Sequence, residues 1–172
     1  MAAIFAFKCN SCGDVHEGSP SFGFRAPDHY VELSAEQQAA NRLSDDLCVI
    51  ERNGTTDRFI RAVLEVPIHG ASEPFLWGVW VSLSENSFKR YVEIFDEPVP
   101  GEGFFGWVCN DISLYPYAHS RAADVIVQGG RNRPKVVLHK GDPEDDPLVN
   151  DQVQGISIAR AQELAERAMH GD

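Results

Sequence analysis

The sequence has few basic residues and lacks long apolar runs. Fifteen Lys and Arg stand against 26 Asp and Glu, which gives a formal net charge of −11. A chain that repels phosphate does not suit general binding to nucleic acid or to an anionic membrane surface. The longest apolar run, "PFLWGVWVSL" at residues 74–83, is too short to cross a bilayer as a helix. These features predict that the protein binds neither nucleic acid nor a membrane.

Targeting signals and familiar catalytic motifs are missing as well. Residues 1–7 carry no basic segment of the kind that begins a signal peptide, so we expect a cytoplasmic protein. The sequence contains no nucleophile elbow, P-loop or Rossmann glycine pattern. In a cytoplasmic chain, four cysteines are expected to be thiols or metal ligands rather than disulfides.

The hydrophobic pattern predicts an α+β fold with a mainly antiparallel sheet built from hairpins. Residues 47–68 form the first expected hairpin, because Asn53-Gly54 readily takes positive φ in a two-residue turn. Residues 74–83 are apolar almost throughout, which is typical of a central strand covered on both faces. The segments "ADVIVQ" and "KVVLH" flank "GGRNRP" as a second expected hairpin.

Helix-capping side chains predict three to four helices. The residues at the expected N-cap positions are Ser34, Ser84, Asp146 and Ser157. The length suits one domain over residues 1–172. Within it, residues 1–33 are expected to form a zinc-knuckle-like loop and an irregular region packed on the sheet, and residues 34–172 the α+β body.

Cys9 and Cys12 form a Cys-x-x-Cys-Gly motif with the spacing of a zinc knuckle. Two thiolates at this spacing can both reach one tetrahedral ion. Gly13 permits the backbone bend that directs amide N–H groups at sulfur. The sequence has no second Cys-x-x-Cys and no His pair, so the other ligands must be single residues. Zinc is the expected metal, with iron as the less favoured one.

The candidates for the remaining ligands are ranked by their position in the chain. Cys48 and His16 come first, Cys109 follows, and His29 is weaker. Taken alone, Cys48 and Cys109 are more often buried small hydrophobic residues. Four protein ligands would make the site closed and structural, whereas three would leave a position for a reactive water.

Other interpretations of the Cys pair and of the aromatic residues stay open. The pair can be redox-active or simply unliganded, but glycines and a proline after Cys12 disfavour the helix that usually follows a redox pair. Trp80, Trp107 and Tyr115 are candidates for a binding groove. Packing in the core explains these aromatic residues equally well.

At the level of longer motifs the chain resembles the bacterial family called domain of unknown function 2199. The segments that carry the resemblance are "FKCNSCGDVH", "SDDLCVIE", "FIRAVLEVPI", "EPFLWGVWVSLSENSFKRY", "GWVCNDISLYPY" and "DDPLVNDQVQGISIARAQEL". The resemblance implies no activity, because none is assigned to the family. It implies that Cys9, Cys12, His16 and Cys48 belong together as ligands, and it places Cys109 last.

One departure from the family pattern concerns the start of an expected helix. Where the family usually has His-Pro-Leu, this chain has Asp146-Pro147-Leu148. A role that rests on that imidazole is therefore not implied here. Aspartate is still a good N-cap residue, so the structural role is expected to survive.

Three functional hypotheses follow from these residues. The leading one is a structural-zinc-binding interaction or binding module whose partner is a protein or a small molecule. The alternative is a metal-dependent hydrolase with an open zinc site near Cys9 and Cys12. The second alternative is an acidic antagonist of a basic partner protein.

Overall fold

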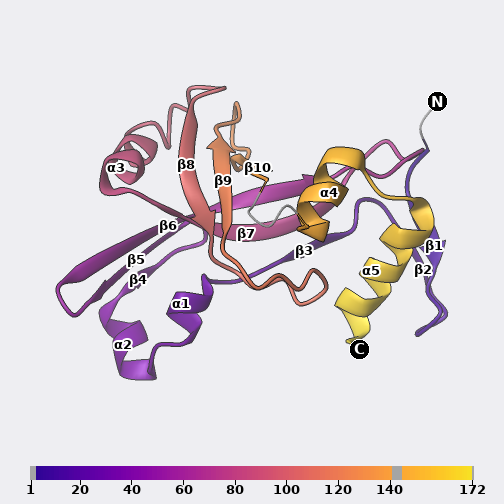
Figure 1. Cartoon of the computed structure of the whole chain (residues 1–172), viewed down its shortest axis with the longest axis horizontal. Helices are drawn as coiled ribbons and strands as arrows, with labels where there is room; N and C mark the ends of the chain where they lie inside the picture. Colours follow the sequence, from indigo (N-terminus) through magenta and orange to yellow (C-terminus); the bar gives the residue numbers. More distant parts are fainter. Residues whose placement is uncertain (1–2, 141–144, 172) are drawn as a thin grey trace.

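The computed structural model of the chain describes residues 3–140 and 145–171, and in these residues it contains ten strands and five helices (Figure 1). The strands are β1 (Ala6–Lys8), β2 (Val15–Glu17), β3 (Ser21–Gly23), β4 (Arg42–Leu43), β5 (Leu47–Arg52), β6 (Thr55–Val66), β7 (Phe75–Leu83), β8 (Gly103–Val108), β9 (Arg121–Ile126) and β10 (Lys135–Leu138). The helices are α1 (Asp28–Val31), α2 (Ala35–Ala40), α3 (Glu85–Glu93), α4 (Pro147–Gln154) and α5 (Ile158–His170). The fold is α+β, as the sequence predicts.

Five strands close into a barrel at the centre of the molecule. β6, β7, β8, β9 and β10 pair in this order, and β10 pairs again with β6. The β10–β6 pairing is parallel and the other four are antiparallel. Closure leaves no unpaired edge among these strands. β5 and β4 extend the sheet beyond β6, and β3 extends it beyond β7.

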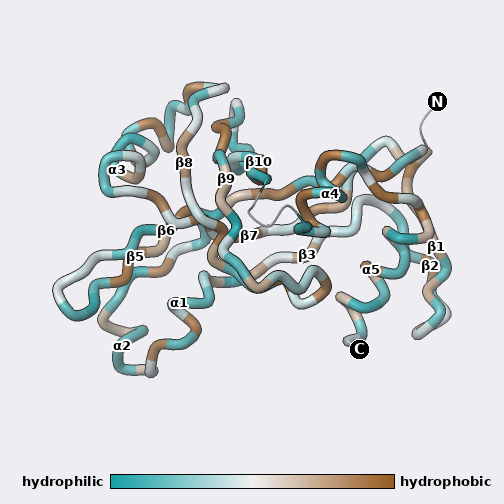
Figure 2. Tube along the Cα trace, in the orientation of Figure 1, coloured by the Kyte–Doolittle hydropathy of each residue, from teal (hydrophilic) through white to brown (hydrophobic). Residues whose placement is uncertain are grey.

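β6 and β7 are long enough to belong both to the barrel and to the parts of the sheet that extend beyond it. The first half of β6 pairs with β5, and Val63 and Leu64 farther along pair with β10. In β7, residues 76–78 pair with β3, and residues 81–83 pair with β8. Figure 2 shows hydrophobic residues recurring along the central strands, whereas the tip of the β5–β6 hairpin is hydrophilic.

The core has two parts on opposite faces of β6 and β7. Alternate residues of β6 point into the main cluster and are fully buried: Ile60, Ala62, Leu64 and Val66. Trp77 of β7 belongs to the same cluster, whereas Trp80 lies in a second one on the other face. This second cluster, here called the Trp80 cluster, consists of Leu33, Cys48, Ile50, Phe59, Trp80 and Cys109. The predicted strand is confirmed as β7, whose main-cluster face is buried and whose other face is buried at Trp80 and half-buried at Leu76, Gly78 and Ser82.

The local turn and cap predictions are also confirmed. Asn53 and Gly54 have φ of 53° and 78°, as the tight β5–β6 turn requires. The side chains of Ser34, Ser84, Asp146 and Ser157 each accept a hydrogen bond from a backbone N–H in the first turn of α2, α3, α4 and α5. Such caps depend on a few consecutive residues, so the sequence alone reveals them.

The structure corrects the finer predictions of the fold. The main sheet is mainly antiparallel and contains both predicted hairpins, but it closes into a barrel and includes two parallel pairings, β3–β7 and β10–β6. Residues 19–33 are not wholly irregular, because they contain β3 and α1. The described residues include α1 as a fifth helix. Hydrophobic periodicity identifies a strand but not the strand that pairs with it. The pairing of Ser21 with Leu76 therefore cannot be predicted from neighbouring residues.

Helix α5 brings the end of the described chain back to its start. It lies beside the β1–β2 hairpin (Figure 1). Ala161, Leu164 and Ala165 are buried on one face of α5 and join the main cluster. Phe5, Phe7 and Cys9 enter the same cluster from the N-terminal side. Among the described residues, none of the helices combines the length and the apolar composition that crossing a bilayer requires.

Candidate metal centre

The Cys pair lies in the turn of the β1–β2 hairpin. Cys9 N–H donates to Asp14 O at 2.8 Å, and Gly13 N–H donates to Cys9 O at 2.9 Å. Gly13 has φ of +78°, a conformation that L side chains rarely adopt. This turn places Cys12 N–H 3.5 Å from Cys9 Sγ. The predicted arrangement, in which a backbone amide points at a sulfur, is therefore present.

Three side chains come together at this turn. The ligand atoms of Cys9, Cys12 and His170 all lie within 4.8 Å of one another. Cys9 Sγ is 3.3 Å from His170 Nε2. Sulfur and nitrogen ligands of one tetrahedral zinc ion, at about 2.3 Å and 2.0 Å from the metal, lie about 3.5 Å apart. The spacing of these side chains therefore suits a shared metal ion.

His16 lies next to this group. It sits in the middle of β2, opposite Phe7 of β1, and its ring is 5.3 Å from the Phe7 ring. His16 Nε2 is 3.4 Å from Cys12 Sγ, which again matches the separation of two ligands. His16 is outside the group of three whose ligand atoms are all mutually close. The hairpin therefore brings one predicted histidine to the Cys pair, within reach of a fourth ligand position.

Sequence reasoning missed His170. This residue ends α5 and is 161 positions from Cys9. A histidine in the last turn of a helix is ordinarily explained by the helix dipole. The available signal was the spacing of Gln162, Glu166 and His170, which places three polar side chains on one helix face.

That polar face of α5 makes the contacts that hold the knuckle. Gln162 Nε2 donates to Lys8 O at 3.2 Å. Asn10 donates to Glu166 twice, from its backbone N–H to Oε1 at 2.7 Å and from Nδ2 to Oε2 at 3.2 Å. His170 completes the row at Cys9. The hairpin turn is thus hydrogen-bonded to the helix along two helical turns.

The electrostatics of the site favour one thiolate. Burial raises the pKa of Cys9, but the N–H groups of Cys12 and Ser11 and the side chains of Cys12 and His170 outweigh it and lower the pKa to about 7. For Cys12, the backbone N–H of Asp14 lowers the pKa, but burial and the neighbouring Cys9 together raise it above its ordinary value. The negative charge of a Cys9 thiolate therefore disfavours ionisation of Cys12. A bound cation would stabilise both thiolates.

The structure does not bring Cys48 to the knuckle. Cys48 lies on β5 opposite Phe59 of β6, is fully buried, and belongs to the Trp80 cluster. Burial raises the pKa of its thiol to about 12. In Figure 1, β5 and the β1–β2 hairpin lie at opposite sides of the molecule. His170 thus replaces Cys48 among the candidate ligands, because the β5–β6 hairpin turns Cys48 into the core.

Two lower-ranked candidates also lie away from the Cys pair. Cys109 is in the Trp80 cluster, where its Sγ donates to Trp107 O at 3.1 Å and burial raises its pKa. His29 lies on α1, with its ring 5.4 Å from the Phe59 ring. The position of Cys109 fits the simpler interpretation of this cysteine as a buried packing residue, whereas His29 is exposed.

The three aromatic residues considered for a groove do not share a surface. Trp80 is fully buried in the Trp80 cluster, and its Nε1 donates to Phe24 O at 3.1 Å. Tyr115 is 1% exposed and packs edge-on against Trp77 in the main cluster. Trp107 is 45% exposed on the outside of β8. Two of the three are core residues, which fits the alternative interpretation that they pack in the core.

Asp146 caps α4 and forms a buried ion pair. Its Oδ1 accepts from Leu148 N–H at 3.0 Å. Arg121 donates to both of its carboxylate oxygens, at 2.6 Å and 3.0 Å, and also to Tyr115 O. Aspartate therefore keeps the cap and adds a charge that a neutral imidazole lacks.

The chain belongs to a family described as uncharacterized proteins conserved in bacteria (DUF2199), which matches residues 8–156. This identification confirms the resemblance seen in the sequence. No curated protein and no solved structure matches the chain. The matched residues include Cys9, Cys12 and His16 and end before α5, so His170 lies beyond them.

Proposed function

We propose that this protein is a binding module whose N-terminal knuckle is fastened to its C-terminal helix by a structural zinc ion. The ligands in this proposal are Cys9, Cys12, His16 and His170. The observation that carries it is the convergence of Cys9, Cys12 and His170, whose ligand atoms lie within 4.8 Å of one another although they come from the two ends of the chain.

The chemistry of the donors supports zinc as the metal. Two thiolates and two imidazoles form one of the ordinary tetrahedral zinc sets. Thiolate ligands disfavour magnesium and calcium, which prefer oxygen. Iron is the second choice for a tetrahedral site that contains sulfur. The cation also neutralises the two thiolates, of which Cys9 already has a lowered pKa.

The surroundings of the site support a structural role. Asn10 and Glu166 fix the turn to α5, and a hydrogen bond from Gln162 fixes the end of β1. Outer contacts of this kind orient ligands and raise metal affinity. Four protein ligands fill a tetrahedral shell, so no position remains for a reactive water. Zinc in this site would stabilise the docking of α5 on the hairpin.

Metal content tests the proposal. The chain and its Cys12→Ser and His170→Ala variants are purified under reducing conditions and analysed for zinc and iron. Cys48→Ala and His119→Ala serve as matched controls, because both residues lie outside the group. We expect about one zinc per chain in the parent and the controls and a clear loss in the two ligand variants. Metal below about a tenth of an equivalent in the parent would refute the proposal.

Cobalt substitution tests the closed ligand set. Co²⁺ in a tetrahedral site with two thiolates gives intense d–d bands and sulfur-to-metal charge-transfer bands. We expect both in the parent, and a weaker, shifted spectrum in His16→Ala as water replaces the imidazole. An unchanged spectrum in His16→Ala would exclude His16 as a ligand and would leave an open position on the metal.

A metal-dependent hydrolase is the second candidate, and the exposure of Cys12 and His170 favours it. Under this alternative a water replaces His16 on the metal and is activated by it. The matching test measures hydrolysis of an activated ester by zinc-loaded protein, with the Cys12→Ser variant as control. Hydrolysis that requires both zinc and Cys12 would support this alternative over the structural one.

A further inference from the structure

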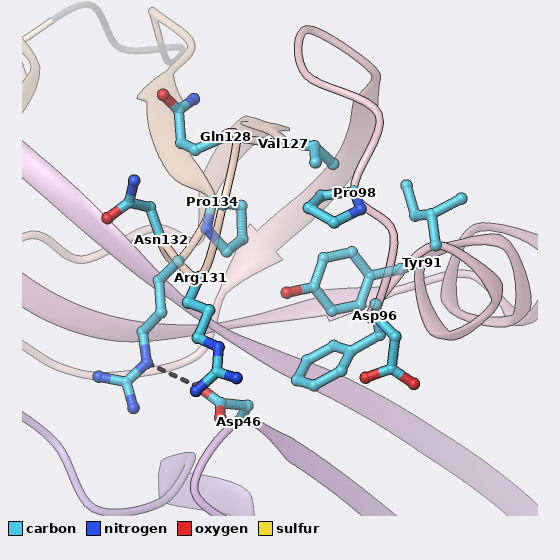
Figure 3. Close-up of a pocket in the computed structure, with 13 residues that line it drawn as sticks. Asp46, Tyr91, Asp96, Pro98, Val127, Gln128, Arg131, Asn132 and Pro134 are labelled. Carbon is cyan, nitrogen blue, oxygen red and sulfur yellow. Dashed lines mark hydrogen bonds and ion pairs between the residues drawn. The ribbon is translucent and has the colours of Figure 1, made fainter.

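A cavity of about 360 Å³ lies far from the knuckle, between α3 and the loop that joins β9 to β10 (Figure 3). Its walls include Tyr91 of α3, Phe95 just after this helix, Arg131 and Arg133 of the loop, and Asp46 between β4 and β5. The volume is within the range of about 300–1,000 Å³ that is typical of small-molecule sites.

Tyr91 presents to this cavity a hydroxyl group that has no hydrogen-bond partner among the described residues. The side chain is 7% exposed, and its ring packs edge-on against Phe95 and Phe104 at centroid distances of 5.9 Å and 6.2 Å. Figure 3 shows the hydroxyl directed across the cavity towards the side of Arg131 and Pro134. Within residues 3–140 and 145–171 it forms no hydrogen bond. The ring is buried while the hydroxyl faces the cavity, so a ligand bound there can accept a hydrogen bond from it.

A second unmatched group comes from the loop. The Arg133 Nε donates to Asp46 at 2.7 Å, which fixes and neutralises that guanidinium. Arg131 enters the cavity beside it (Figure 3). In the described part of the chain it forms neither an ion pair nor a hydrogen bond. Asp96 lies on the opposite side of the cavity. Among the described residues, the side facing Tyr91 therefore offers a guanidinium without an ion-pair partner, in a protein whose net charge is −11.

The rest of the wall combines apolar side chains with the amides of Gln128 and Asn132. Ile94, Phe95, Pro98 and Pro134 line the cavity together with Val127. Rings of phenylalanine and proline suit a planar apolar body. A guanidinium binds a carboxylate through two parallel hydrogen bonds, and the Tyr91 hydroxyl can donate a further one. One guanidinium matches a monoanion better than a phosphate dianion, because Asp46 and Asp96 are close.

We propose that this cavity binds a small aromatic carboxylate, with Arg131 and Tyr91 holding the carboxylate and the apolar wall holding the ring. The inference identifies a ligand class for the binding role and does not rest on the metal centre, because no candidate metal ligand lines the cavity. A negative metal analysis would therefore not contradict ligand binding in the cavity, and absence of ligand binding would not contradict the metal centre.

The test uses benzoate as the probe and benzamide as its neutral analogue. Binding to the whole chain is measured by chemical-shift titration and by the change in melting temperature. We expect saturable one-to-one binding of benzoate, at least tenfold weaker binding of benzamide, and no competition from equimolar inorganic phosphate. Absence of saturable benzoate binding in the millimolar range would overturn the proposal. Equal binding of benzamide, or competition by phosphate, would overturn it as well.

Two variants assign the roles of the side chains. Tyr91→Phe keeps the ring packing and removes the donor, and Arg131→Gln removes the charge at an exposed position. Each is expected to weaken benzoate binding about tenfold, as the loss of a hydrogen bond to a charged group does. Arg25→Gln, an exposed arginine outside the cavity, is the matched control. Unchanged affinity in both cavity variants, with their folds verified by circular dichroism, would refute the assignment.

Discussion

The knuckle and the Trp80 cluster each contain two cysteines, and they differ in the exposure of one cysteine and in the polar groups that surround the sulfur atoms. Cys12 of the knuckle is exposed, and Cys9 lies beside His170 and backbone N–H groups. Cys48 and Cys109 are surrounded by apolar side chains. The pKa of Cys9 is lowered to about 7, whereas burial raises the pKa of Cys48 to about 12. The same side chain is a ready thiolate in one place and a small hydrophobic group in the other.

The difference shows how each region is stabilised. The Trp80 cluster is held by the burial of Trp80, Phe59 and Ile50 on one face of β5, β6 and β7. The knuckle is a short hairpin whose turn is held mainly by polar contacts with α5. A two-stranded hairpin has little stability by itself. If zinc binds as proposed, we expect it to stabilise the knuckle strongly and to leave the Trp80 cluster unaffected.

Removal of metal should produce the largest effect. At free zinc a thousandfold above the dissociation constant, the bound ion adds about 4 kcal/mol to the free energy of unfolding. We expect a chelator to remove this stabilisation from the parent and from Cys48→Ala but to have no effect on His170→Ala. Urea unfolding with and without chelator measures the three differences. If the parent unfolds identically in both conditions, the knuckle is not a metal-stabilised region.

Serine in place of cysteine should then separate the regions without metal. In chelator, Cys48→Ser places a hydroxyl in a fully buried apolar site and is expected to cost about 1–3 kcal/mol. Cys12→Ser changes an exposed side chain and is expected to cost less than about 0.5 kcal/mol. Urea unfolding of both variants provides the comparison. A larger loss in Cys12→Ser would reverse the assignment of the two regions.

A contact outside the ligand set should have a smaller effect on the knuckle. Glu166 accepts two hydrogen bonds from Asn10, and these contacts lower its pKa together with a hydrogen bond from Gln162. We expect Glu166→Ala to weaken zinc binding about tenfold, because the turn is less well positioned. Competition with a chelating dye measures the affinity. Glu163→Ala, on the exposed side of the same helix, should leave it unchanged.

The pH dependence of the metal-free protein should distinguish the thiols of the two regions. Because the pKa of Cys9 is lowered from about 9 to about 7, its contribution to stability is complete above pH 9 and is lost as pH falls through 7. The pKa of Cys48 is raised, so its contribution is complete below pH 9 and is lost as pH rises towards 12. The urea midpoint of the parent should therefore rise as the pH increases through 7 and fall as the pH increases from 9 to 11. Cys9→Ala should lack the rise, and Cys48→Ala should lack part of the fall. Parallel curves for both variants and the parent would contradict these assignments.

Local features were predictable in both regions. The caps at Ser34, Ser84 and Ser157 and the turn at Asn53-Gly54 each depend on a few neighbouring residues. The alternation in β6 identified its buried face, because side chains in a strand point to opposite sides in turn. The choice between Cys48 and His170 was not local. Cys48 is 39 positions from Cys9 and His170 is 161, and neither separation indicates proximity.

By itself the sequence determined the family, the α+β class, the caps and turns, and a Cys-x-x-Cys turn open to metal. Only the tertiary structure decided that β10 closes the barrel on β6, that α5 delivers His170 to Cys9, and that Tyr91 faces Arg131 across a cavity. The first group depends on bonds and contacts within a few residues. The second group depends on which buried faces pack against one another. Hydrophobic periodicity shows which face of an element is buried but not which element covers it.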